Sequence, residues 1–217
     1  MAQPSAGYIQ AYPPGVRENG GQYSHAGVWA LMAQADMATR RSDRDIGPEP
    51  VAGDLAYRYF TYLSPAHRAR HPTRGGAYAI EPYVMAGDVY TQQPYTGRGG
   101  WSWYTGAAAW MHRAAVESLF GLRLGATQLS FRPCLPSHWP RAELTLRRGE
   151  RVLRFVLIRA PASEALLATA PLGAQLLQPA QELRWTELPE HSCHVIPLGS
   201  PSGAASVDVG APADMQI

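Results

Sequence analysis

The sequence predicts an α+β protein in which a helical part precedes a β module. Before residue 125, apolar residues recur at helical spacing between loops rich in Gly and Pro. After that point the period falls to two, as in half-buried strands. The chain has 217 residues and is 46% hydrophobic, which is enough to bury the core of one large domain or two small ones.

Three helices are expected in the helical part. Ser24 is a suitable N-cap for the first helix and Asp54 for the second, because their side-chain oxygens can accept a free backbone N–H. Gly121 can end the third helix in the left-handed conformation. The expected helices and their apolar faces are 25–39 with Val28, Leu31, Met32 and Ala35, 55–63 with Leu55, Tyr59, Tyr62 and Leu63, and 106–120 with Ala109, Val116, Leu119 and Phe120.

Short strands separated by turn residues are expected in the β module. The expected strands are 127–131 with Leu129 and Phe131 inward, 142–146 with Ala142, Leu144 and Leu146, 151–158 with Leu153, Phe155 and Leu157, and two with weaker patterns at 182–188 and 193–198. Residues 199–217 are small and polar, which predicts a disordered tail. The predicted division is therefore 1–125, 126–198 and 199–217.

Composition and charge narrow the function classes. The net charge is +2 and the 19 Lys and Arg residues form no long basic run, so nucleic-acid binding is not expected. No segment has the length of apolar sequence that a transmembrane helix needs. Cys134 and Cys193 are expected to be reduced and structural, which favours a cytoplasmic location. The histidine pairs lack supporting Cys or carboxylate residues, so no metal site is predicted.

Two loops carry polar and aromatic residues in a pattern typical of a ligand site. The first, around Arg17, Glu18 and Gln22, leads into the helix that begins near His25. The second leads into another helix start, where the free N–H groups and the helix dipole favour an anion such as phosphate. Aromatic faces beside polar groups suit the C–H faces and hydroxyls of a pyranose. The residues of interest in the second loop are Arg98, Trp101, Trp103, Tyr104, Thr105 and Gly106, while Asp88 upstream is interpreted as structural.

Three separated stretches stand in an order that is more specific than any one alone. They read "GYIQAYPPGVRENGGQYSHAGVWALMAQA", "EPYVMAGDVY" and "GRGGWSWYTGAAAWMHR", and "PCLPSHWPRAELTLRR" follows. In these stretches the chain resembles glycoside hydrolase family 94, a glycosyltransferase 36-like family. Within it, the chain is most similar to the phosphorylase-like domain of cyclic β-1,2-glucan synthases, although a β-1,4 linkage stays open.

The resemblance implies a fold and a reaction. It implies the C-terminal helices of an (α/α)6 catalytic barrel, followed by a β-sandwich of the jelly-roll type. The implied reaction is inverting phosphorolysis, in which inorganic phosphate attacks the anomeric carbon of a terminal glucose and gives α-glucose 1-phosphate. No cofactor is implied besides phosphate as co-substrate. The implied partners are a β-glucan oligosaccharide and phosphate.

The resemblance also implies roles for single residues. His25, in the pattern "E-N-G-x-x-x-x-H", and Thr105 with Gly106 match phosphate-contacting positions, and Glu18 matches a position that faces the acceptor sugar. The candidates for further substrate contacts are Arg17, Gln22, Arg98, Trp101, Trp103 and Tyr104. Structural roles stay open for several of them: His25 as a helix-start packing residue, Thr105 as an N-cap, the tryptophans as core, and Arg98 as a loop-holding residue.

One departure from the family bears on activity. The general acid of the family lies in a "W-N-D-G" motif, and this motif does not occur in the 217 residues. The resemblance therefore implies a C-terminal fragment that is inactive alone. Its implied partner is the missing N-terminal half of the barrel. Attachment of the parent enzyme to the inner membrane is one option. Two alternatives stay open: a non-catalytic carbohydrate-binding remnant, and a complementing subunit of a split enzyme. Apolar faces meant for missing neighbours are expected to be exposed.

Overall fold

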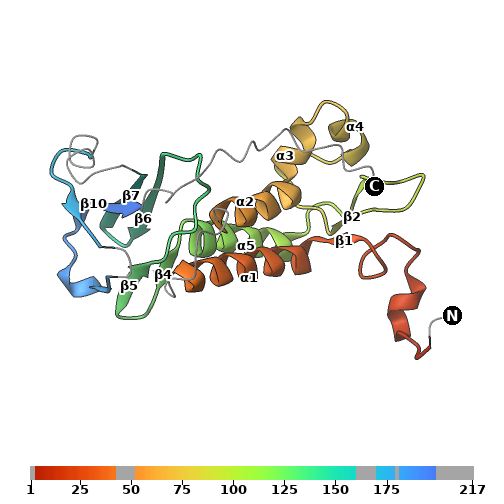
Figure 1. Ribbon diagram of the computed structural model, residues 1–217, viewed down its shortest axis with the longest axis horizontal. Helices are drawn as coiled ribbons and strands as arrows, with labels where there is room; N and C mark the ends of the chain where they lie inside the picture. Colours follow the sequence, from red (N-terminus) through yellow and green to blue (C-terminus); the bar gives the residue numbers. More distant parts are fainter. Residues whose placement is uncertain (1–2, 43–51, 160–169, 179–180, 199–217) are drawn as a thin grey trace. The chain divides into compact units, whose positions relative to one another are not determined.

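The computed structural model describes residues 3–42, 52–159, 170–178 and 181–198 and confirms a mixed helix and sheet protein (Figure 1). The predicted tail lies outside these residues. The chain forms two compact units. The helical unit comprises the described residues up to Gln34 together with Tyr57–Ala114, and the β unit comprises Ala35–Ala56 together with the described residues from Ala115 onward.

Most helices lie before residue 120 and most strands after it, and many of them are labelled in Figure 1. The helices are η1 (Gly7–Ala11), α1 (Ser24–Ser42), α2 (Ala52–Leu63), α3 (Pro65–Arg70), α4 (Arg74–Tyr78), α5 (Thr105–Arg113), the π-helical η2 (Ala114–Leu119) and η3 (Trp185–Glu187). The strands are β1 (Gln22–Tyr23), β2 (Asp88–Val89), β3 (Gly99–Gly100), β4 (Leu122–Leu124), β5 (Gln128–Phe131), β6 (Arg141–Arg148), β7 (Arg151–Arg159), β8 (Gln175–Leu176), β9 (Leu183–Arg184) and β10 (His191–Leu198).

The predicted face of α1 is confirmed. Val28 and Leu31 are fully buried and Ala35 is buried with them, because they recur at helical spacing. In the helical unit α1 lies beside α2 and α5 (Figure 1). A Cβ on Gly27 would lie 2.7 Å from Cδ2 of Leu63, so a glycine is what allows the close approach of α1 and α2.

The predicted face of α2 is wrong at Leu55 and Tyr62, although Leu63 is buried as predicted, and the helix begins earlier than predicted. The helix begins at Ala52, so Asp54 lies in its first turn, and Leu55 and Tyr62 are exposed while Ala56 is fully buried. A Cβ on Gly53 would stand 2.2 Å from the carbonyl oxygen of Leu135. The backbone approach is therefore close, and only small residues fit on the side of the helix that is buried there. The Asp54 carboxylate instead accepts hydrogen bonds from the backbone N–H and the hydroxyl of Ser137, at 2.7 and 2.8 Å.

The predicted third helix changes type within its length. α5 is α-helical only to Arg113, and the next six residues form the π-helix η2. Ala107 and Ala114 are fully buried, whereas Ala109, predicted to face inward, is exposed. The wider turn of the π-helix shifts the register, so one α-helical face cannot be continued across it. Gly121 has a positive φ of 86°, as predicted.

A small antiparallel sheet, which the sequence did not reveal, joins the two polar loops. Its order is β1-β2-β3, with Tyr23 opposite Asp88 and Asp88 opposite Gly100. The backbone N–H of Ser24 extends the connection by donating to the carbonyl of Gly87 at 2.9 Å. Segments separated by more than 60 residues are thus held side by side at the starts of α1 and α5.

The β unit contains two sheets. In the first, of order β6-β7-β10-β8, β6 is antiparallel to β7, and β10 is parallel to both β7 and β8. The second has the order β4-β5-β9 and is antiparallel. The predicted inward residues of β5 and β7 are confirmed, since Leu129 and Phe131 are almost fully buried and Phe155 is fully buried. The predicted strand at 182–188 is wrong beyond its first residues, because β9 gives way to η3.

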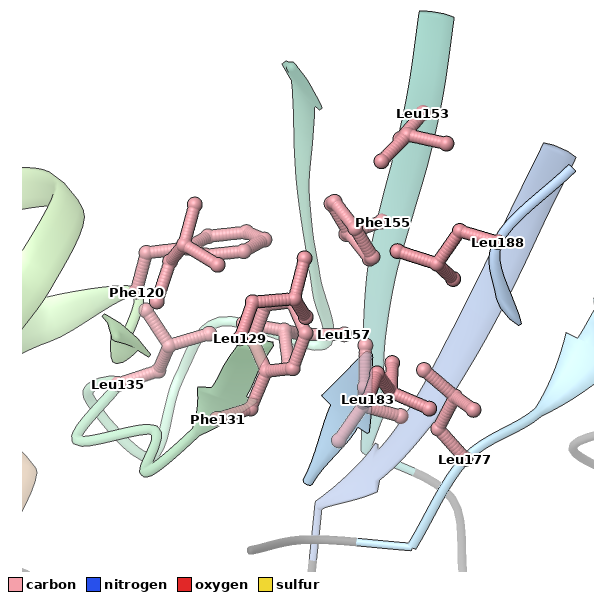
Figure 2. Close-up of a cluster of buried hydrophobic side chains, with 12 residues drawn as sticks. Phe120, Leu129, Phe131, Leu135, Leu153, Phe155, Leu157, Leu177, Leu183 and Leu188 are labelled. Carbon is pink, nitrogen blue, oxygen red and sulfur yellow. The ribbon is translucent and has the colours of Figure 1, made fainter. Parts of the chain in front are cut away.

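Side chains of both sheets form one hydrophobic cluster (Figure 2). Phe131 of β5 packs against Phe155 of β7 with ring centres 4.8 Å apart. Burial of this cluster removes apolar area from water, which is the main stabilising contribution to such a unit. Both cysteines are free, as predicted, and burial raises the pKa of the Cys134 thiol to about 11.

Candidate functional site

The loop before α1 is closed by its own hydrogen bonds. The backbone N–H of Gly15 donates to the carbonyl of Asn19 at 2.8 Å, and the Asn19 side chain donates to the carbonyl of Tyr12, also at 2.8 Å. Between them Arg17 has a positive φ of 51°, which is uncommon for a residue other than glycine. The loop is therefore a fixed turn that directs Arg17 inward.

The guanidinium of Arg17 lies among aromatic rings. Its central carbon is 4.4 Å from the ring centre of Trp101, 4.9 Å from that of Tyr23 and 5.5 Å from that of Tyr104. Such contacts attract a cation to the electron-rich ring faces. Arg17 is only 8% exposed, and its Nε lies 3.8 Å from a carboxylate oxygen of the more exposed Glu18. The first loop thus contributes a buried cation and a carboxylate that reaches the surface.

Asp88 of β2 connects the two loops. It is fully buried, and its Oδ2 accepts the backbone N–H of Arg17 at 2.5 Å. Burial raises the pKa of the Asp88 carboxyl, while the hydrogen bond and the charge from Arg17 act in the opposite direction. A Cβ on Gly100 would lie 2.6 Å from Oδ1, so the neighbouring strand must carry a glycine at this point.

Tyr23 and Tyr104 link the first loop to the start of α5. Their hydroxyl oxygens are 3.0 Å apart, within hydrogen-bond distance. The hydrogen bond to Tyr104, together with burial, raises the pKa of Tyr23 to about 12. The Tyr23 phenol is therefore neutral at physiological pH, and whichever of the two hydroxyls accepts this hydrogen bond keeps its own O–H for a ligand oxygen.

His25 lies beside the first turn of α5. A Cβ on Gly106 would be 4.0 Å from Cε1 and Nδ1 of the imidazole. The ring is also held by Trp29, with ring centres 4.8 Å apart, and by Trp110 at 6.0 Å. Its Nε2 is buried and has no hydrogen-bond partner. The Nδ1 edge of the ring therefore faces the helix N-terminus, an arrangement that suits an anion.

Two tryptophans of the second loop point their surfaces to solvent. Trp101 is 60% exposed and Trp103 64% exposed, so they are not core residues in the described part of the chain. Tyr83, 75% exposed, packs edge-on against Trp103 with ring centres 6.3 Å apart. Exposed aromatic surface of this size beside polar groups is suited to the C–H face of a sugar.

Gln22 and Arg98, two of the candidates for substrate contact, make their observed contacts with other residues of the protein. Gln22 donates to the carbonyl of Tyr62 at 3.2 Å and accepts a hydrogen bond from Arg68 at 2.5 Å, so its amide ties the loop to α2 and α3. Arg98 is exposed, with its guanidinium 6.0 Å from the ring centre of Tyr95. Within the described residues no hydrogen bond joins its side chain to those of the first loop.

The sequence interpretation missed the central residues of the cluster. Tyr23 was not among the candidate site residues, yet it hydrogen-bonds to Tyr104. Asp88, interpreted as structural, accepts the backbone N–H of Arg17, a contact of that kind. Trp110, which packs on His25, was also missed. The only signal for Tyr23 was its place beside Gln22, because the two-residue strand β1 leaves no periodic pattern.

Neither a metal site nor a membrane-spanning helix is found among the described residues. Among the described residues, no group of His, Cys, Asp and Glu side chains gathers that could hold a metal ion. None of the described helices combines the length and the apolar character needed to cross a membrane.

Comparison with known proteins places these loops in context. Residues 2–121, more than half of the chain, match the profile of the Glycosyl hydrolase 94 superfamily, catalytic domain. The chain is 46% identical over 134 residues to the cyclic beta-(1,2)-glucan synthase NdvB of Rhizobium meliloti, a match that covers 62% of this chain and 4% of that protein.

Two phosphorylases are more distant relatives. The N,N'-diacetylchitobiose phosphorylase of Vibrio proteolyticus is 29% identical over 141 residues, which is 64% of this chain and 16% of the relative. The solabiose phosphorylase of Paenibacillus borealis is 27% identical over 151 residues, which is 69% of this chain and 18% of the relative. The chain therefore spans less than a fifth of the length of these relatives.

Proposed function

Because the chain belongs to the glycosyl hydrolase 94 superfamily, we propose that it carries the phosphate-binding and part of the sugar-binding loops of a glycoside phosphorylase that acts on a β-glucan. The observation that supports this most directly is the position of His25 beside Gly106 at the start of α5. Loops far apart in the sequence meet there. The proposed site is made by both.

The phosphate is proposed to bind between His25 and the first turn of α5. The Nδ1 edge of the His25 imidazole, which faces Gly106, can donate to one phosphate oxygen, and the hydroxyl of Thr105 and the backbone N–H of Gly106 can donate to others. In inverting phosphorolysis this phosphate attacks the anomeric carbon from the face opposite the leaving sugar. The residues hold and orient the nucleophile, which lowers the entropic part of the barrier.

The sugar is proposed to lie on the side of Glu18 and the exposed tryptophans. The Glu18 carboxylate can accept hydrogen bonds from sugar hydroxyls, and Trp101 or Trp103 can stack on a pyranose face. A β-1,2 linkage is favoured because the glucan synthase relative has the highest identity among the relatives compared. Carbohydrate binding without turnover is a second candidate function, which the exposure of the two tryptophans favours.

The chain is proposed to be inactive by itself. The "W-N-D-G" motif is absent from its 217 residues, so the general acid has to come from another segment. We propose that α1, α2 and α5 belong to an (α/α)6 barrel and that the β unit is the following β-sandwich. The exposed Trp29 on α1 and Leu55 on α2 support this, because they are apolar surfaces suited to further helices.

Two assays on the purified chain test this function. Glucose 1-phosphate formation from a β-1,2-gluco-oligosaccharide and phosphate should not exceed the blank, while titration should detect binding of the oligosaccharide. Glu18→Gln should weaken that binding by roughly tenfold, as expected for loss of one hydrogen bond to a charged group. Arg147→Gln, at an exposed position of β6, is the control and should leave it unchanged. Turnover by the chain, or binding that ignores Glu18, would overturn the corresponding part of the proposal.

A further inference from the structure

Arg17 and Asp88 lie at the centre of the cluster without reaching the surface. Asp88 is fully buried and Arg17 is 8% exposed. Nε and Nη1 of Arg17 and Oδ1 of Asp88 are buried with no hydrogen-bond partner. Burying charged groups that are incompletely hydrogen-bonded costs free energy of folding. The burial of Arg17 and Asp88 together therefore indicates a functional role.

The position of Arg17 is determined from its backbone. The Asp88 carboxylate accepts the Arg17 N–H, and the carbonyl of Arg17 accepts the N–H of Gly21 at 2.9 Å. A Cβ on Gly21 would stand 2.7 Å from the backbone nitrogen of Arg17, so the turn has no room for a side chain at position 21. Together these contacts stabilise the left-handed conformation of Arg17 and fix the direction of its side chain.

The guanidinium then lies between two side chains proposed to contact the sugar. Its central carbon lies over the Trp101 ring, 4.4 Å from the ring centre. Its Nε is 3.8 Å from the Glu18 carboxylate. No hydrogen bond or ring contact joins Arg17 directly to His25 within the described residues. The shortest contacts of Arg17, to Trp101 and Glu18, are therefore on the sugar side, while those to Tyr23 and Tyr104 are longer.

We propose that Asp88 and Arg17 are positioning residues for sugar binding: Asp88 fixes the turn, and Arg17 orients the Glu18 carboxylate and the Trp101 ring without touching the sugar itself. This inference rests on the proposed function of the cluster, since it presumes that Glu18 and Trp101 meet the glucan. It replaces direct substrate contact as the role of Arg17. Its Nε and Nη1 are buried, so these two donors do not face a ligand.

The test separates sugar binding from phosphate binding in the full 217-residue chain. Arg17→Met keeps the length of the side chain and removes the charge. It should weaken binding of a β-1,2-gluco-oligosaccharide by about tenfold, equivalent to loss of one charge-assisted contact, and change inorganic phosphate binding less than about twofold. Arg17→Lys should recover part of the sugar affinity, because it restores the charge but not the planar stacking. Arg147→Met, at an exposed position of β6, should change neither.

A merely structural role predicts a different pattern. If Arg17→Met lowers the melting temperature and weakens sugar and phosphate equally, the inference is overturned. If Arg17→Met does not fold, Arg17→Lys carries the test with the same split between ligands. A sugar affinity that is unchanged in Arg17→Lys and in Asp88→Ala would also overturn it.

A second measurement needs no ligand and separates this inference from the proposed function. The Nε–H signal of Arg17 in the NMR spectrum should persist against exchange and should shift in Glu18→Gln, because the two side chains are in contact. If the wild-type chain binds no oligosaccharide, the proposed function fails, and the NMR result decides the Arg17–Glu18 coupling by itself. No shift in Glu18→Gln would contradict the coupling.

Discussion

Gly106→Ala should separate the stability of α5 from its capacity to bind phosphate. Gly106 is the second residue of α5 and is exposed. A Cβ there would meet only the ring of His25, at 4.0 Å, an ordinary van der Waals distance, so the folded chain accepts the methyl group. Replacing a helical glycine by alanine should raise the free energy of unfolding by about 0.5 to 1 kcal/mol, because the unfolded chain loses freedom.

Phosphate binding should move in the opposite direction. The new methyl group stands beside the imidazole, where the proposed anion lies, and hinders one of its charge-assisted hydrogen bonds. Loss of such a bond costs about 1.5 to 3 kcal/mol, or roughly tenfold to hundredfold in affinity. Urea unfolding measures the first effect and phosphate titration by calorimetry the second. Gly76→Ala on α4 is the control, since no atom lies within 4 Å of a Cβ there. A stabilised Gly106→Ala chain that binds phosphate as the wild type does would refute the location of the site.

Two further predictions concern the β unit. Phe155→Ala should lower the free energy of unfolding of this unit by about 3 to 5 kcal/mol, because Phe155 is fully buried against Phe131. Leu176→Ala, at an exposed position, is the control and should cost less than about 1 kcal/mol. Equal losses of the two variants in urea unfolding would contradict the packing. Burial lowers the pKa of His194, so the unfolded chain binds the extra proton first and the free energy of unfolding should fall as the pH drops below about 6.5. His194→Gln should remove this part of the pH dependence, and an unchanged slope between pH 7.5 and 5.5 would argue against it.

The sequence predicted those parts of the fold in which one period continues through an element. Val28 and Leu31 of α1 and Phe155 of β7 are buried as their spacing requires. The predicted face of α2 was wrong at Leu55 and Tyr62, because the helical spacing of large apolar residues does not show where another backbone lies close. There Ala56 is fully buried and Leu55 exposed, since the close approach of Gly53 to another backbone admits only small residues.

The remaining features depend on contacts between distant segments. The π-helix η2 shifts a register that local spacing cannot reveal. The parallel pairing of β7 with β10 depends on long-range packing and not on the pattern of either strand. For the site, the family motifs selected His25 and Gly106, which the structure places together, but the roles proposed for Gln22 and Arg98 differ from their observed contacts.

The central claim, that phosphate binds between His25 and the start of α5, is tested most directly by NMR titration of the histidine rings with inorganic phosphate. We expect added phosphate to cause saturable shifts of the His25 ring signals and of the Gly106 amide. His25→Ala and Thr105→Ala should each weaken phosphate binding by roughly tenfold to hundredfold, and the double variant should be less than additive because both contact one anion. The exposed His112 on α5 is the matched control, and His112→Ala should bind phosphate like the wild type. If the His25 signals do not respond to phosphate, or if His25→Ala lowers only the melting temperature, His25 is a helix-start packing residue and the claim is wrong.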